Sequence, residues 1–213
     1  MTSAIPIVFI VDDDVSVRES VELLVRNEKW KPETFASAQE FLNHPRTLVP
    51  TCLVLDLSLP GLNGLELQNR LAAEHIDMPI IFITGYGDVP KSVRAMKAGA
   101  LEFLTKPLDS SALISAIRKA LERSRLALAQ AAEMQELRAR YALLTSRERQ
   151  VMALVVSGLL NKQAGGELGI SEITVKAHRR QVMEKMKADS LASLVKLAAK
   201  RGVPRQSSPP VSR

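Results

Sequence analysis

The sequence predicts an α/β domain with a doubly wound, five-stranded parallel sheet, followed by a long connector helix and a small all-α domain. Short apolar runs alternate with helix-like stretches up to about residue 108, and a repeated strand-then-helix order is typical of a parallel sheet covered on both faces. Residues 109–144 contain neither Pro nor Gly and are rich in good helix formers. Beyond them, short helical patterns follow one another without strand signals.

Five short segments are expected to form the strands, and four amphipathic stretches the covering helices. Continuous apolar runs suit parallel strands that are buried on both faces. The expected strands are IVFIV (7–11), the weaker KPETF (31–35), CLVLD (52–56), PIIFIT (79–84) and ALEFLTKP (100–107). The expected helices are VSVRESVELLVRN (15–27), SAQEFL (37–42), GLELQNRLAAE (64–74) and VPKSVRAMKAG (89–99). Ser37 and Glu40 have the spacing of a capping box, and Gly99 is a natural helix stop.

The second half is expected to be helical throughout. Asp109 or Ser110 can cap a connector helix that continues to about Leu144. The helix has a partial apolar stripe, which leaves a dimeric coiled coil open as an alternative. Positions such as Ser124 interrupt the stripe and weaken that alternative.

Two further signals organise the small domain. TSRE (145–148) has the capping-box spacing at the start of a helix. LGIS (168–171) contains a Gly that is expected at the turn between two short helices.

Charge and composition separate the two halves and exclude some classes of protein. Residues 1–108 contain 10 Lys/Arg and 14 Asp/Glu, whereas residues 109–213 contain 19 and 9, so a polyanion is a natural partner for the second half. The single Cys52 lies in an apolar run, which favours a buried thiol in a reducing compartment and no disulfide framework. No stretch has the length of a membrane span or the pattern of a leader. We therefore expect a cytoplasmic protein without a membrane partner.

Reactive side chains stand where the expected strands end. Three Asp residues (12–14) follow the first strand, Asp56 ends the third, Thr84 ends the fourth and Lys106 follows the fifth. The carboxyl ends of parallel strands meet at one edge of a sheet, where ligands bind. Neighbouring carboxylates repel one another, and either a solvated turn or a bound cation can relieve that repulsion. The convergence of all these groups favours a cation such as Mg²⁺, which accepts carboxylate and phosphate oxygens.

Four motifs of the first half resemble the receiver domain of bacterial two-component response regulators. They are VDD (11–13), LVLDLSLPGLNG (53–64), ITGYG (83–87) and FLTKP (103–107). The resemblance implies a receiver domain at 1–122 that takes a phosphoryl group from a sensor histidine kinase.

The resemblance also implies which residues bind the metal ion and which accepts the phosphoryl group. Asp56 is the implied phosphoacceptor. Asp13 is implied to ligate Mg²⁺ directly and Asp12 through water, with Asp56 and the Ser58 backbone carbonyl completing the set.

Residues around the phosphoryl group receive roles from the same resemblance. Thr84 is implied to donate a hydrogen bond to the group, and Lys106 to neutralise its charge. Phe103 is the implied switch aromatic, which turns inward when Thr84 is drawn towards the phosphate. Pro107 is implied to follow a cis peptide bond, which is plausible for X-Pro. Asp14 lies beyond the matched pair and is expected to be solvated or to cap the next helix.

The second half resembles the four-helix LuxR-type helix-turn-helix domain. The markers are LTSRE (144–148), NKQ (161–163), ELGISEITVKAHRRQVMEKM (167–186) and LVKLA (194–198). Together with the receiver motifs they make the chain similar to regulators of the FixJ/NarL type, in particular the FixJ-like branch. We therefore expect a helical linker at 123–142, a DNA-binding domain at 143–201 and a disordered tail at 202–213.

The helix that follows LGIS has the features of a DNA-reading helix. Val175, Val182 and Met186 recur at helical intervals and are expected to face the core. Lys176 and Arg180 are i,i+4 neighbours on a face narrow enough for a major groove. By resemblance, the base-reading residues are Lys176, Ala177 and Arg180. The residues expected on phosphates are Asn161, Lys162, Ser171, Thr174 and Arg179.

Ala164, Gly165 and Gly166 depart from the family pattern, which usually has larger apolar residues after NKQ. Each Gly in a helix interior costs about 1 kcal/mol relative to Ala. We expect the first helix of the reading motif to be frayed and DNA affinity to be weakened, so that an Ala164→Ile, Gly165→Ala double variant gains thermal stability.

These observations predict a transcription factor and not an enzyme. Phosphorylation of Asp56 is expected to produce a homodimer through about residues 90–105, which binds near-palindromic double-stranded DNA; contact with RNA polymerase stays open. One alternative is an aspartyl-phosphate phosphatase, which would rapidly release phosphate from small phosphomonoesters. Another is a phosphorylation-independent DNA-binding regulator with the receiver as an interaction module, in which Asp56→Asn leaves promoter binding unchanged.

Overall fold

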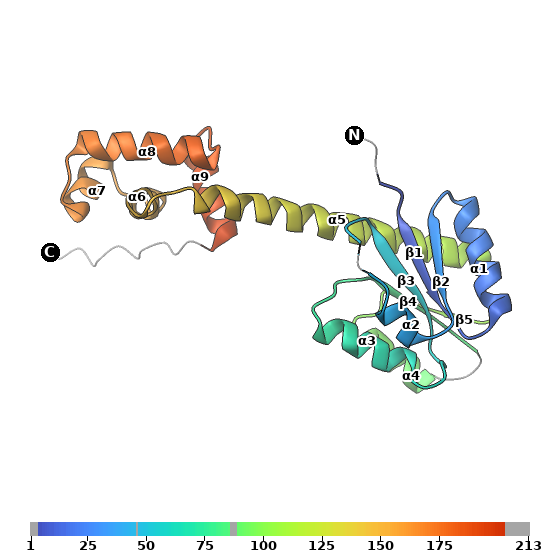
Figure 1. The fold of residues 1–213 in the computed structure, drawn as a ribbon. Helices are drawn as coiled ribbons and strands as arrows, with labels where there is room; N and C mark the ends of the chain where they lie inside the picture. The colour runs from blue at the N-terminus through green and yellow to red at the C-terminus, as the bar shows by residue number, and fades with distance from the viewer. Residues whose placement is uncertain (1–3, 46, 86–88, 203–213) are drawn as a thin grey trace. The chain divides into compact units, whose positions relative to one another are not determined.

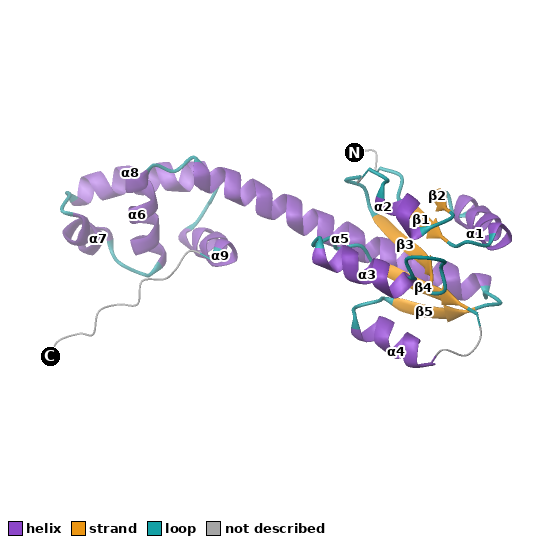
Figure 2. Cartoon of the chain, turned by 60° about the horizontal axis from the view of Figure 1, so that its bottom comes forward, coloured by secondary structure: helices purple, strands orange, loops and turns teal. Residues whose placement is uncertain are grey.

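The computed structural model describes residues 4–45, 47–85 and 89–202 and divides the chain into two compact units, 1–130 and 131–213. The first unit alternates strands and helices, and the second is helical (Figures 1 and 2). The division falls inside the range 123–142 that the sequence marks as a linker. The tail predicted at 202–213 lies outside the described residues apart from Gly202, which caps the last helix.

The first unit confirms the predicted fold class. Its strands pair in parallel in the order β2-β1-β3-β4-β5. The strands are β1 (Ile7–Val11), β2 (Lys31–Phe35), β3 (Thr51–Asp56), β4 (Ile80–Thr84) and β5 (Glu102–Thr105). The helices are α1 (Val15–Asn27), α2 (Ala38–Leu42), α3 (Gly64–Ala73), α4 (Val89–Lys97) and α5 (Ser110–Ala142), the last of which continues into the second unit.

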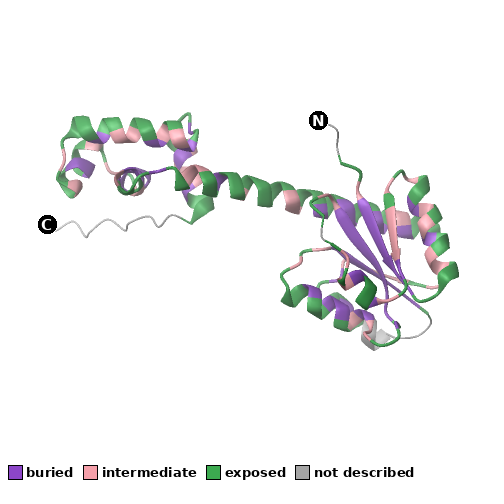
Figure 3. Cartoon of the chain, viewed as in Figure 1, coloured by how far each residue is buried: buried purple, intermediate pink, exposed green. Residues whose placement is uncertain are grey.

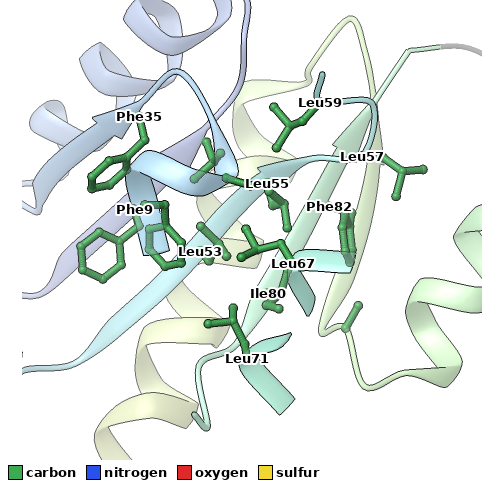
Figure 4. Close-up of a cluster of buried hydrophobic side chains, with 14 of the residues drawn as sticks. Phe9, Phe35, Leu53, Leu55, Leu57, Leu59, Leu67, Leu71, Ile80 and Phe82 are labelled. Atoms are coloured by element: carbon green, nitrogen blue, oxygen red, sulfur yellow. The ribbon is translucent and has the colours of Figure 1, made fainter. Parts of the chain in front are cut away.

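The strands of this sheet divide the core into two layers, because successive side chains point to opposite faces. The strands are almost entirely buried at the centre of the sheet (Figure 3). Phe9, Leu55 and Phe82 belong to the cluster that packs beneath α2, α3 and α4 (Figure 4). Ile10 and Ile83 belong to the opposite cluster, beneath α1 and α5. Five parallel strands held in this way bring their carboxyl ends to one edge.

Capping hydrogen bonds mark the first residues of the helices near the predicted positions. The Asp109 side chain accepts the Ala112 N–H at 2.8 Å and so caps α5. At α2, the Ser37 hydroxyl accepts the Glu40 N–H at 3.2 Å. The Glu40 carboxylate, however, accepts the N–H of Ala36 at 2.9 Å. The capping box predicted here is therefore formed on one side, with its return bond displaced by one residue.

The second unit is a bundle built from four short helices and the end of α5. The helices are α6 (Ser146–Val156), α7 (Asn161–Leu168), α8 (Glu172–Met186) and α9 (Leu191–Arg201). The predicted capping box at the start of α6 is complete, with reciprocal bonds between Thr145 and Glu148. Within the described ranges, no helix is both long enough and apolar enough to cross a bilayer.

The last turns of α5 belong to the core of this second unit. Leu137 is 3% exposed and shares a cluster with buried residues of α6, α8 and α9. Two guanidinium groups lie over the ring of Tyr141, that of Arg201 at 4.0 Å and that of Arg149 at 5.2 Å from the ring centroid. These contacts attach the end of α5 to the helices that follow it.

Candidate functional site

An ammonium group bridges two buried carboxylates at the carboxyl edge of the sheet. The Lys106 Nζ, just after β5, lies 2.7 Å from the Asp12 Oδ2 and 2.7 Å from the Asp56 Oδ2. Asp12 follows β1 and is fully buried, whereas Asp56 ends β3 and is 5% exposed. The structure therefore brings together groups that lie 94 and 50 positions apart in the sequence.

The second oxygen of each carboxylate is held by a backbone N–H two residues further on. Asp12 Oδ1 accepts the Asp14 N–H at 2.9 Å, and Asp56 Oδ1 accepts the Ser58 N–H at 2.9 Å. Both side chains are consequently fixed at both oxygens, which orients them before any ligand arrives. The Asp14 carboxylate points elsewhere, since it accepts the Ser16 N–H at 2.8 Å and caps α1.

Burial and pairing act on the protonation of this cluster in opposite directions. Burial raises the pKa of Asp12 above its ordinary value, although the hydrogen bonds from Lys106 and from the Asp14 N–H work against it. For Lys106, burial acts to lower the pKa, but the hydrogen bonds to Asp12 and Asp56 outweigh it and the pKa is raised. Lys106 is thus held as a cation, and its hydrogen bond favours the ionised form of Asp12 against the effect of burial.

Three carboxylates of this edge are close enough to share a metal ion. One oxygen each from Asp12, Asp13 and Asp56 lies within 4.8 Å of the others, with the Asp13 side exposed to solvent. Carboxylate oxygens form the hard donor set that Mg²⁺ and Ca²⁺ prefer. When all three are ionised, they carry two more negative charges than the single Lys106 ammonium balances, so the cluster fits a divalent cation. Ser58, two residues after Asp56, is exposed to solvent.

Thr84 and Phe103 lie on β4 and β5 near this cluster, and Pro107 follows β5 directly after Lys106. Thr84 is 3% exposed at the end of β4, and its carbonyl oxygen accepts the Lys106 N–H at 2.7 Å. Phe103 is half-buried on β5 and packs against the core cluster beneath α2, α3 and α4. The predicted cis peptide bond before Pro107 is confirmed. Residues 86 and 87, which complete the ITGYG motif, lie outside the described residues.

Gly64 is a residue of this site that the sequence analysis missed. A Cβ at this position would lie 2.6 Å from the backbone oxygen of Asp56 and 3.1 Å from the Leu57 Cα. Any side chain here would push against the backbone that carries Asp56. The available signal was a Gly at the first position of a helix, where helix propensity alone disfavours it.

A second candidate site lies on α7 and α8 of the second unit. The predicted core face of α8 is confirmed, since Val175, Val182 and Met186 are fully buried. Lys176, Ala177 and Arg180, to which the sequence assigns base contacts, are all exposed on this helix. The surface of α8 therefore combines a cationic side with an apolar core side.

Polar contacts among the remaining expected DNA-binding residues cap the start of α8 and link its middle to α7. The Ser171 hydroxyl accepts the Thr174 N–H at 3.1 Å, and the two hydroxyl groups lie 2.8 Å apart. The Arg179 guanidinium donates to the Asn161 Oδ1 at 3.2 Å, which links α8 to the first residue of α7. Lys162 is exposed beside it.

The expectation of a frayed first helix was wrong in its reasoning about Gly165. Helix α7 runs without interruption from Asn161 to Leu168, and Gly165 is buried in it. A Cβ on Gly165 would lie 2.7 Å from the Ile170 carbonyl oxygen, in the turn before α8. Glycine is required there by close backbone contact, so the Gly165→Ala change in the double variant cannot be expected to stabilise the unit. The effect of this segment on DNA affinity stays a prediction.

Two protein families match the two units. The family described as "Response regulator receiver domain" matches residues 8–142, and "Bacterial regulatory proteins, luxR family" matches residues 142–198. Together these matches extend across both candidate sites.

Relatives match over nearly the whole chain. Nodulation protein W of Bradyrhizobium diazoefficiens is 46% identical over 197 residues, which cover 92% of this chain and 87% of that protein. The transcriptional regulatory protein FixJ of Rhizobium meliloti is 42% identical and covers 92% and 96%. The solved structure of the response regulator StyR is 48% identical with a TM-score of 0.86, covering 92% of this chain and 100% of that one. Full-length FixJ from B. japonicum is 39% identical with a TM-score of 0.56, covering 93% and 98%.

Proposed function

Since the chain belongs to the two-component response regulators that carry a receiver domain and a LuxR-type DNA-binding domain, we propose that phosphorylation of Asp56 controls its binding to DNA. The phosphodonor is a phosphohistidine of a sensor kinase. The protein works in the cytoplasm, where bacterial DNA lies. A near-palindromic promoter site is the target of the phosphorylated homodimer, and RNA polymerase is a further candidate partner.

The observation that carries this proposal is the bridge from Lys106 to Asp12 and Asp56. A carboxylate that is buried, oriented at both oxygens and next to a fixed cation is suited to nucleophilic attack on phosphorus. A carboxylate with a purely structural role at a strand end would need no such paired arrangement. Asp56 also lies where the sheet rule locates ligands, at the carboxyl end of a central strand.

The transfer forms one bond and breaks another. A carboxylate oxygen of Asp56 forms a bond to phosphorus while the bond from phosphorus to the donor imidazole nitrogen breaks. The electron pair leaves with that nitrogen, and the product is an acyl phosphate. The Lys106 ammonium then neutralises a phosphoryl oxygen, since it already contacts the Asp56 carboxylate.

Asp12, Asp13 and Asp56, with the Ser58 backbone carbonyl, are the proposed holders of Mg²⁺. The close spacing of the three carboxylates supports this assignment. Mg²⁺ when bound supplies charge neutralisation for the phosphoryl oxygens.

The phosphoryl signal is proposed to leave the site through Thr84 and Phe103. The hydroxyl of Thr84 turns to the phosphoryl group, and the space it leaves admits the Phe103 ring. The half-buried position of Phe103 on the edge strand β5 supports this role, because an edge aromatic can move without opening the whole core. Dimerisation through about residues 90–105 follows in this proposal, since the phosphoryl group stabilises the dimerising conformer more than the resting one.

Binding to DNA is proposed to use α8 in the major groove. Lys176, Ala177 and Arg180 read base edges, because they are exposed on the side away from the core. The other expected contacts go to phosphates, from Asn161, Lys162, Ser171, Thr174 and Arg179. The link from Arg179 to Asn161 supports a shared phosphate contact from α7 and α8.

Incubation with acetyl phosphate and Mg²⁺, followed by intact-protein mass spectrometry, tests the proposal. The wild type is expected to gain the mass of one phosphoryl group, and Asp56→Asn to gain none. Asp77→Asn, which changes an exposed carboxylate of the same unit, is the matched control and should label like the wild type. An unlabelled wild type, with acetyl phosphate and with a phosphorylated kinase alike, contradicts the proposal.

A further inference from the structure

A large apolar side chain stands on the cationic surface of α8. Ile173 is 78% exposed at the second position of this helix. Residues three, four and seven positions further on share its face of the helix. They are Lys176, Ala177 and Arg180, all exposed. The face proposed to enter the major groove therefore begins with an isoleucine that packs against neither core cluster of its unit.

Thymine has the chemistry that fits an apolar group at this position. In the major groove, thymine differs from cytosine by a C5-methyl group, and apolar side chains contact that methyl. The N-terminal residues of a recognition helix are those that reach base edges. We infer that Ile173 is a specificity-determining residue, which reads a thymine methyl through apolar contact. The inference rests on the proposed entry of α8 into the major groove.

The cations around Ile173 favour nucleic acid over a protein partner as the occupant. Lys176 and Arg180 lie on the same face, and Arg179 of the same helix donates to Asn161, whose neighbour in the sequence is the exposed Lys162. An apolar patch meant for a protein would be expected to have more than one large apolar member, whereas Ala177 is small. Isoleucine is also stiff at χ1 in a helix, so little rotamer freedom is lost when it contacts a base.

The spacing along α8 locates the thymine relative to the base that Lys176 reads. Three residues of helix advance about 4.5 Å, which is close to one step of about 3.4 Å along a DNA strand. The thymine contacted by Ile173 is therefore expected within about two base pairs of that base. The base pair at which a substitution disrupts the Lys176 contact, and the thymine at which loss of the methyl group weakens binding, should then be neighbours in the site.

Uracil scanning tests the inference on the full-length protein. A duplex is first selected from a random library by the wild type in the presence of beryllofluoride and Mg²⁺. Each thymine of the selected site is then replaced singly by deoxyuridine, which removes only the C5-methyl. At one thymine per half-site, replacement by deoxyuridine is expected to lower the affinity of the protein for the duplex about four-fold. This is the effect expected from the loss of one buried methyl-sized group.

Two variants separate this reading from a general loss of binding. Ile173→Ala is expected to bind the thymine duplex about four-fold more weakly and to be insensitive to uracil at that position. Leu143→Ala, which shortens another exposed apolar residue of the same unit, should keep the full uracil sensitivity. Thermal melting of Ile173→Ala should match the wild type, because the side chain is exposed.

The outcomes distinguish this inference from the function on which it rests. If the wild type selects a sequence but Ile173→Ala retains every uracil effect, Ile173 does not read thymine and the inference is overturned. If no uracil substitution weakens the wild type, it is overturned equally. If the wild type selects no sequence at all, the proposed DNA binding fails as well.

Discussion

The buried hydroxyl of Ser124 on α5 accepts the backbone N–H of Thr51, the first residue of β3, at 3.0 Å. Ser124 is one of the positions at which the apolar stripe of the connector helix is interrupted. Helix α5 covers the start of this central strand, and the Ser124 hydroxyl gives the buried Thr51 N–H an acceptor that an apolar side chain could not provide. The interruption is therefore part of how α5 packs on the sheet, and the face of α5 that carries Ser124 is already buried within the first unit.

Replacing Ser124 by Ala is expected to destabilise the first unit by about 1–3 kcal/mol, because the Thr51 N–H is left buried without an acceptor. Urea unfolding measures the loss, and faster hydrogen exchange at the Thr51 amide locates it. Ser20→Ala is the control, since the exposed Ser20 hydroxyl donates to the Ser16 carbonyl oxygen of its own helix. Equal losses in the two variants would contradict the explanation.

Gly165 and Gly166 are adjacent in α7 and are expected to respond to alanine in opposite ways. Gly165→Ala brings a methyl group 2.7 Å from the Ile170 carbonyl oxygen, and overpacking of this kind typically costs about 1–3 kcal/mol. Apart from its chain neighbours and the nearby backbone of its own helix, a Cβ on Gly166 meets no described atom within 4 Å. Gly166→Ala should therefore stabilise by up to about 1 kcal/mol through helix propensity. Thermal unfolding of the second unit distinguishes them. A higher unfolding temperature in both variants would restore the expectation that α7 is frayed.

The ion pair between Glu148 and Lys185 is expected to make the second unit sensitive to acid. The Glu148 carboxylate contacts the Lys185 Nζ at 2.7 Å and accepts the Thr145 N–H at 2.8 Å. Burial acts to raise the pKa of Glu148, but these hydrogen bonds outweigh it and hold the pKa below the ordinary 4.5. Because the folded-state pKa is the lower one, this stabilisation is present above pH 4.5 and is lost as pH falls through the folded-state pKa.

Glu148→Gln isolates the charge, since Gln can still complete a capping box. We expect a loss of about 1–3 kcal/mol at neutral pH, and a smaller difference from the wild type in acid. Denaturant unfolding at a series of pH values measures both. Glu167→Gln, on an exposed carboxylate of α7, should show neither effect. A difference that stays constant with pH would refute the role of the charge.

Glu172 is expected to restrain the DNA affinity of α8. Its carboxylate lies 2.9 Å from the Lys176 Nζ, and both side chains are exposed. Glu172→Gln removes an exposed pair worth about 0.3–0.5 kcal/mol, so affinity should rise about two-fold. The slope of log K against log salt should become steeper by up to about 0.9.

Fluorescence anisotropy over a range of salt concentrations measures both changes. Glu184→Gln is the control on the same helix, since it lies about 18 Å away along the axis and salt screens charges beyond about 8 Å. Identical salt slopes for Glu172→Gln and Glu184→Gln would argue against the restraint.

The sequence predicts the sheet and its reactive edge well because both depend on local pattern. Continuous apolar runs define the strands, and the sheet rule then brings Asp12, Asp56 and Lys106 to one edge without knowledge of any distance. The core face of α8 follows in the same way from the period of a helix, through Val175, Val182 and Met186.

Contacts between segments distant in sequence could not be predicted in this way. The bond between Ser124 and Thr51 joins residues 73 positions apart. Gly165 is explained by the turn that packs over it and Gly64 by the strand end below it. In each case a residue that local propensity disfavours is required by a neighbour that only the fold supplies.

The continuous helix α5 has a practical consequence for anyone who would graft this DNA-binding unit onto another sensor. A junction at residue 142, where the two family matches meet, would leave Leu137 and Tyr141 with the donor and open the core of the transplanted piece. A junction at 130/131 keeps them, but it falls within a helix. Chimeras must therefore be spliced there without changing the helical phase, since one inserted residue rotates everything after it by about 100°.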